Sequence, residues 1–135
     1  MRTQQEIVDR IERVKADDFF GFETSDLLVA LDYQHAKPYL KPECTEVQWN
    51  QNREPYTPEN CRKQIREYLD FAREKADNGR GLSASRSQSH FRAWIWLACD
   101  DEVLARVEAV GYAPYGKPKL RVIEAHYGRT PALSA

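Results

Sequence analysis

Apolar side chains recur at intervals of three and four residues along most of the chain, which is the period of an amphipathic α-helix. The longest such stripe lies between a helix-start signal, Thr57-Pro58-Glu59, and the helix-stop pair Asn78-Gly79. The stripe consists of Cys61, Ile65, Tyr68, Leu69, Ala72 and Ala76. This pattern predicts a helix of about five turns over residues 58–77.

The N-terminal segment predicts a surface helix over residues 4–16. Thr3 and Glu6 have the spacing of a capping box, in which each side chain hydrogen-bonds the backbone amide of the other residue. The residues that follow alternate between an apolar stripe and a charged face at helical spacing. The stripe consists of Ile7, Val8, Ile11 and Val14.

The segment after this helix is rich in phenylalanine. Phe19, Phe20 and Phe22 surround Gly21, and we expect some of these rings to close the core beneath a corner of the chain. A groove for a partner, or the seam of a homodimer, is the alternative use of the same rings. A short helix capped by Thr24 or Ser25 is predicted over 26–31, although a buried strand fits the same apolar run.

Residues 32–57 have the least regular pattern. Pro38, Pro42 and Pro55 each remove a backbone donor and disfavour helix in the preceding residue. We expect an irregular connection that packs through its aromatic side chains and contains one or two helical turns at 45–49.

The densest apolar run begins after a loop rich in Gly, Ser and Arg. Ser85 and Gln88 have capping-box spacing, and a helix is predicted from 85 to 98. We expect Trp94 at its centre and Trp96 nearer an edge, with Arg92 placed for a cation–π contact with Trp96. The apolar face consists of Phe91, Trp94, Ile95 and Ala98, widened by Leu97.

Two further helices are predicted near the C-terminus. Three acids at 100–102 mark the start of a short amphipathic helix whose apolar positions follow over 103–110, and the positive end of the helix dipole stabilises these acids. The last element, 119–127, fits either a helix or a strand, and its flanking Pro118 and Gly128 favour the helix. We expect the tail, 129–135, to fray.

These elements predict an all-α fold, a single domain spanning residues 1–135 with five or six helices and an irregular Pro- and aromatic-rich connection. A small α+β fold is the fallback. The 135 residues suffice for a buried core, and 41% apolar with 30% charged side chains is ordinary globular composition. No apolar run approaches the length of a membrane span, and no signal-peptide pattern precedes the first helix. Three cysteines without metal spacing suggest no disulfide framework and no metal, so we expect a cytoplasmic protein.

Charge is distributed unevenly along the chain. Residues 1–79 carry 12 basic and 16 acidic side chains, whereas residues 80–135 carry 8 basic and 5 acidic ones, and the net charge is −1. No acid occurs between Asp77 and Asp100, where Arg80, Arg86 and Arg92 lie. A solvated basic face explains this pattern, and an anion-binding surface is the functional alternative.

The chain contains no recognised catalytic or cofactor motif, so we predict no catalytic residues, cofactor or metal ligands. The one candidate site is the loop and helix start at 80–90, where free backbone amides and the helix dipole favour an anion. Helix capping and solvated arginines explain the same residues without a ligand. The candidate binding residues are Arg80, Ser83, Ser85, Arg86, Ser87, His90 and Arg92.

Three functional hypotheses follow. The first is a non-catalytic helical interaction module that docks a protein partner through the Arg/Ser-rich helix start, which the absence of a catalytic set favours. The second is a nucleic-acid-binding protein, which near-neutral charge and the lack of a helix-turn-helix spacing oppose. The third is a small enzyme acting on an anionic substrate with His90 as acid or base. The phosphate contacts of the second hypothesis would come from Arg80, Arg86, Arg92, Lys117, Lys119 and Arg121.

Overall fold

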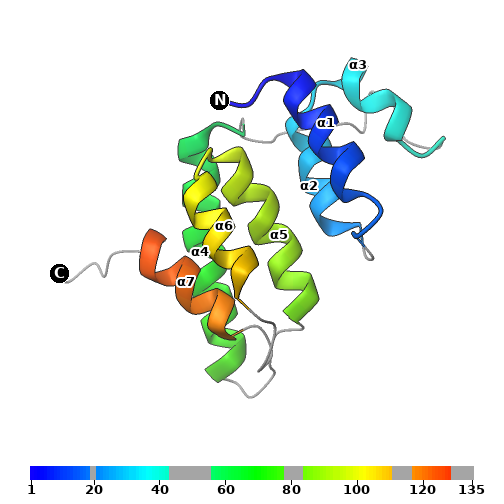
Figure 1. Ribbon diagram of the computed structural model, residues 1–135. Coiled ribbons are helices and arrows are strands. Elements are labelled where there is room, and N and C mark those ends of the chain that lie inside the picture. The colour runs from blue at the N-terminus through cyan, green and yellow to red at the C-terminus, as the bar shows by residue number, and fades with distance from the viewer. Residues whose placement is uncertain (19–20, 43–55, 78–83, 111–116, 129–135) are drawn as a thin grey trace.

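The computed structural model describes residues 1–18, 21–42, 56–77, 84–110 and 117–128, with the backbone alone for 72–77, 84–89 and 117. Seven α-helices and one 3₁₀ turn form among these residues, and no strand occurs among them, so the all-α prediction is confirmed (Figure 1). In chain order the elements are α1 (Gln4–Val14), α2 (Phe22–Ala30), α3 (Tyr33–Ala36), the 3₁₀ turn η1 (Lys37–Tyr39), α4 (Pro58–Asp77), α5 (Ala84–Leu97), α6 (Asp101–Ala109) and α7 (Lys117–Tyr127).

The predicted count of five or six helices is too low, because the sequence did not predict the short helix α3. This helix lies in the segment for which the sequence predicts an irregular connection. Asp32 caps α3 by accepting a hydrogen bond from the amide of His35 at 3.0 Å, and η1 continues the turn with Pro38 near its start. A single turn of helix has no apolar period to detect, so only its local capping stabilises it in isolation.

The start of α1 matches its prediction. Thr3 Oγ1 accepts from the amide of Glu6 at 3.1 Å, and Glu6 Oε1 accepts from the amide of Thr3 at 3.1 Å. The helix ends at Val14, two residues before the predicted end, and buries Ile7 and Ile11 on its inner face.

The start of α2 differs from its prediction. The helix begins at Phe22, after Gly21 in the left-handed region with φ of 73°, and neither Thr24 nor Ser25 caps it. Asp18 Oδ2 instead accepts from the amide of Thr24 at 2.7 Å. The cap therefore comes from outside the helix, because the glycine turn brings the Asp18 carboxylate over the first turn.

The C-terminal helices follow the predicted order. Helix α4 has the predicted bounds, with Thr57 Oγ1 accepting from the amide of Asn60 at 3.2 Å. Helix α6 begins at Asp101, among the three acids that the sequence predicts at its start, and α7 confirms the helical alternative for 119–127. The predicted turns at 45–49, the Asn78-Gly79 cap and the tail 129–135 lie outside the described residues, as does the Ser85–Gln88 side-chain pair.

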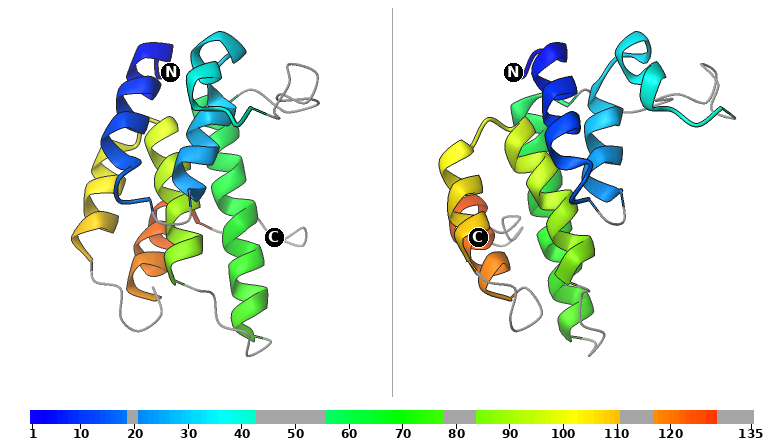
Figure 2. Two further views of the ribbon diagram at one scale, coloured as in Figure 1. Left: turned by 90° about the vertical axis from the view of Figure 1, so that its right-hand side faces the viewer. Right: turned by 45° about the vertical axis from the view of Figure 1, so that its right-hand side comes forward.

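Helix α5 occupies the middle of the bundle. It packs against α2, α4 and α6, while α1 packs on α2, and α7 packs on α4 and α6 (Figures 1 and 2). The second half of α5 is buried almost continuously, so the core is built around it. Fully buried side chains of this core include Ile11, Leu27, Ile65, Phe91, Ile95, Leu97, Val107 and Ile123.

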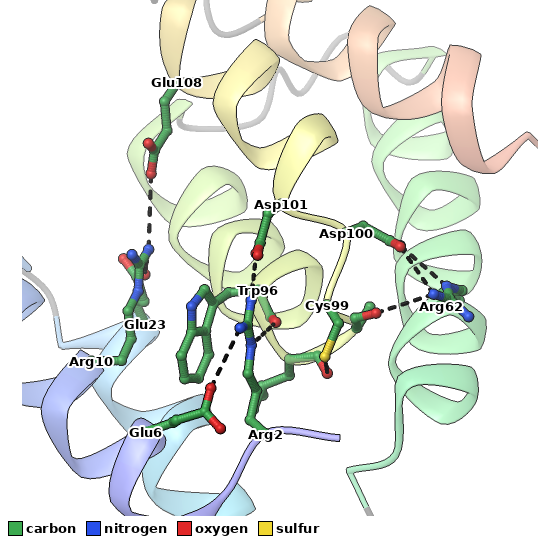
Figure 3. A network of polar contacts seen from close by, with 12 residues as sticks. Arg2, Glu6, Arg10, Glu23, Arg62, Trp96, Cys99, Asp100, Asp101 and Glu108 are labelled. Carbon is green, nitrogen blue, oxygen red and sulfur yellow. Dashed lines mark hydrogen bonds and ion pairs between the residues drawn. The ribbon is translucent and has the colours of Figure 1, made fainter.

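Both tryptophans of α5 are buried, Trp94 with 5% and Trp96 with 8% of its surface exposed. The predicted cation–π contact of Arg92 with Trp96 is wrong. Arg2 and Arg10 instead lie over the Trp96 ring, with their guanidinium carbons 4.4 and 5.7 Å from its centroid. Figure 3 shows Arg2 beside this ring, where its Nε also donates to the Trp96 carbonyl at 3.0 Å.

No helix in the described part of the chain combines the length and the apolar character needed to cross a membrane.

Candidate functional site

The structure describes the side chains of two of the seven predicted binding residues. Arg80 and Ser83 lie outside the described residues. Ser85, Arg86 and Ser87 fall in the first turn of α5, where only the backbone is described. The predicted anion contact at this turn therefore stays a prediction.

His90 lies where three helices meet. Its Nδ1 is 2.5 Å from Oδ2 of Asp26 on α2, and its side chain keeps 22% exposure. The imidazole stacks on Trp94 with ring centroids 5.4 Å apart and planes inclined by 18°. His90 is thus fixed by contacts that span 64 residues of sequence, and the structure places it at the edge of the core rather than in free solvent.

The ring of His90 also belongs to a row of aromatic side chains that crosses α2, α4 and α5. Its centroid lies 5.1 Å from Phe22 and 5.7 Å from Tyr68, and Tyr68 lies 5.6 Å from Phe71. Phe71 is 44% exposed, and Met1 is the other large apolar side chain exposed among the described residues. We call Phe22, Tyr68, Phe71 and His90 the aromatic surface.

The aromatic surface is anchored to the core. Tyr68 makes edge contacts with Phe91 and Trp94, with centroids 5.3 Å away in each case. Both partners are at least nine-tenths buried. The outer rings therefore stand on fixed neighbours, which lowers the entropy cost of using them in binding.

Arg92 pairs with a buried acid on a neighbouring helix. Its Nε lies 3.3 Å from Oε2 of Glu23, a carboxylate on α2 that is 99% buried. Oε1 of the same carboxylate accepts from Nη2 of Arg10 at 3.0 Å. Burial raises the pKa of Glu23 above its ordinary value, even though both arginines act in the opposite direction.

The other chemically interesting groups have structural partners. The Cys61 thiol is 98% buried, and this burial, with a smaller effect of Asp26, raises its pKa to about 12, so it is a poor nucleophile at neutral pH. The acids before α6 contact basic side chains: Asp100 pairs with Arg62, and Asp101 pairs with Arg2 (Figure 3). Among the residues that the structure describes, no three His, Cys, Asp or Glu side chains gather as they would around a metal ion.

Sequence reasoning missed the aromatic surface and its partner Asp26. The apolar period places Tyr68 in the buried stripe of α4, whereas the structure leaves this side chain half-buried. A signal for Phe71 was present, because this large apolar side chain falls outside that stripe on an otherwise polar helix face. For Asp26 there was none, since the pairing depends on how α2 packs on α5.

No protein family, curated protein or solved structure matches this chain. The function has to be inferred from the geometry alone.

Proposed function

We propose that this protein is a non-catalytic helical interaction module that docks a protein partner at the aromatic surface and the adjoining first turn of α5. The observation that carries the proposal is the row of rings from Phe22 to Phe71, rigidly supported from beneath and exposed at Phe71. Aromatic side chains of this kind dominate binding energy at protein interfaces.

Charge indicates the chemistry of the partner. The sequence from Asn78 to Cys99 contains no acid, and Arg80 and Arg86 fall at or just before the start of α5. The positive end of the α5 dipole adds to this charge. A partner segment that carries an apolar side chain next to acidic ones would complement both parts of the surface.

The test is affinity capture followed by measurement with the purified partner. The immobilised wild-type protein is expected to retain one protein in stoichiometric amount from a lysate of its source. Phe71→Ala should weaken the measured affinity about five- to thirtyfold, the range of roughly 1–2 kcal/mol for an interface anchor. Arg86→Glu should also weaken the affinity, and the loss should be larger at low salt than at high salt.

Arg121→Glu, an exposed position on α7, is the matched charge-reversal control and should bind like the wild type. Capture that survives both Phe71→Ala and Arg86→Glu would contradict the proposal. Binding of a mixed-sequence oligonucleotide that falls steeply with salt would support the nucleic-acid hypothesis in its place.

The contact between His90 and Asp26 favours a second candidate, a small enzyme acting on an anionic substrate. A carboxylate bonded to one imidazole nitrogen orients the ring, as in many acid–base sites. A panel of phosphomonoesters and carboxylate esters tests this candidate. Turnover by the wild type that His90→Gln abolishes would support it, and a wild type inert on the whole panel would end it.

A further inference from the structure

A cleft lies on another part of the molecule from the aromatic surface, between α1, α2, α5 and α6. Its volume is about 350 Å³, within the range of about 300–1,000 Å³ that is usual for small-molecule pockets. Three arginines and three carboxylates dominate its lining. The lining residues are Arg10, Arg13, Val14, Asp17, Glu23, Arg92 and Glu108.

The deepest of these groups form a triad in which the buried Glu23 stands between the buried Arg10 and the partly exposed Arg92. Arg10 is 94% buried, and Glu23 is 99% buried. One carboxylate therefore faces two guanidinium groups, which leaves an excess of one positive charge in the triad. Figure 3 shows Arg10 and Glu23 together, with Glu108 of α6 facing them.

Two donors of the triad have no hydrogen-bond acceptor among the described residues. The Nε atoms of Arg10 and Arg92 are both buried without a hydrogen-bond partner there, since Arg92 Nε approaches Glu23 without the required alignment. Glu108 Oε1 is 3.8 Å from Arg10 Nη2, which is an ion-pair distance but too long for a hydrogen bond. An acceptor that enters the cleft, a water molecule or an oxyanion, would satisfy these two donors.

The remaining charges near the cleft define what that acceptor can be. Two buried neighbours offset each other in charge: Asp18, which caps α2, and Lys119, whose surroundings include Arg92 and Glu108. At the rim Arg13 and Asp17 are exposed, and Glu108 is 49% exposed. The floor is thus positive while the rim carries more acid than base, which disfavours a polyanion such as nucleic acid.

We propose that this cleft binds a small oxyanion, a phosphate or carboxylate group with one acidic centre, which lies beside Glu23 against the guanidinium groups of Arg10 and Arg92, with Arg13 at the entrance. The inference does not depend on the protein-docking function, because the two sites use different surfaces. It also gives Arg92 an anion-binding role away from the start of α5.

The test is a nuclear magnetic resonance titration of the full chain with two probes, inorganic phosphate and acetate. The Nε–H resonances of Arg10 and Arg92 are expected to shift along a saturable one-to-one curve. The probe with the lower Kd shows whether the site prefers phosphate or carboxylate. Tripolyphosphate should bind no more tightly than phosphate, because the acids at the rim repel its additional charge.

Substitutions in the cleft test whether the oxyanion binds there. Arg13→Gln, at an exposed position, should raise the Kd about fivefold, and Arg92→Gln should remove saturable binding. Arg106→Gln, exposed on α6 and outside the cleft, is the matched control and should leave the Kd unchanged. Should Arg92→Gln fail to fold by circular dichroism, Arg13→Gln alone decides.

The direction in which Glu23→Gln changes the affinity distinguishes an anion site from a cation site. Loss of its charge makes the floor more positive, so the affinity for the oxyanion should rise, whereas a site for a cation would lose affinity. Absence of saturable shifts at tens of millimolar probe would overturn the proposal, as would a Kd that Arg13→Gln leaves unchanged. Tighter binding of the Arg13→Gln variant would overturn it equally.

Discussion

Asp100 connects three helices through one carboxylate. It directly precedes α6, accepts from Nε and Nη2 of Arg62 on α4 at 3.1 and 2.9 Å, and accepts from the Tyr127 hydroxyl on α7 at 2.8 Å. Burial raises the pKa of Asp100, but the hydrogen bonds from Arg62 and Tyr127 outweigh it, so the pKa is below its ordinary value. A carboxyl with a lowered native pKa stabilises the fold in its ionised form.

Tyr127→Phe tests this carboxylate at the residue scale. The change removes one hydrogen bond to a charged acceptor and should lower the free energy of unfolding by about 1–2 kcal/mol at pH 7. The contribution of Asp100 is present above about pH 3.9, its unfolded pKa, and is lost as the pH falls through the lower native value. The effect of the substitution should therefore shrink at pH 3, as measured by urea unfolding.

The half-buried tyrosine on α3, Tyr33, provides the control for this substitution. Tyr33→Phe should change the stability by less than about 0.5 kcal/mol at either pH. A Tyr127→Phe effect of equal size at pH 7 and pH 3 would show that packing, and not the bond to Asp100, accounts for the loss.

At the scale of the element, the helix starts show how far local chemistry determines a boundary. Thr3 caps α1 and Thr57 caps the first turn of α4 from the positions that the sequence indicates, because each hydroxyl reaches an amide three residues ahead. Helix α2 departs from this rule, since its first turn is capped by Asp18 across the turn at Gly21. A capping partner that lies six residues away has no fixed sequence spacing.

Thr3→Ala tests the capping box. The substitution leaves the amide of Glu6 without its acceptor and should lower the free energy of unfolding by about 1 kcal/mol, measured by urea denaturation. Thr24→Ala makes the same chemical change inside α2, where the hydroxyl was predicted to cap but does not. This control should be neutral or slightly stabilising because alanine is the better helix former, and an equal loss in both variants would contradict the assignment.

At the scale of the whole molecule, α5 decides how the other helices are arranged. One continuous core joins residues from α1 through α7, and α5 supplies the largest share of it. His90 and Arg92, which the sequence assigns to one binding surface, diverge because successive α5 residues face different neighbours: His90 meets Asp26 and the aromatic surface, and Arg92 meets Glu23 and the cleft.

We expect this shared core to unfold in one step. Fluorescence of the three tryptophans, of which Trp94 and Trp96 lie in the core, and far-ultraviolet circular dichroism, which reports all helices, should give coincident urea midpoints. Two separated transitions would show that α1, α2 and α3 unfold independently of the helices around α5, and the prediction of a single domain would then be wrong.

The sequence alone was sufficient for the all-α fold class, for the start of α1 and for both ends of α4, because these depend on contacts three or four residues apart. It also located Trp94 in the core, since that position follows from the apolar period. Only the tertiary structure placed Asp26 beside His90, Glu23 between Arg10 and Arg92, and Phe71 at the exposed end of a row of rings. Those contacts join residues that are distant in the chain, and they depend on which face of each helix meets its neighbour.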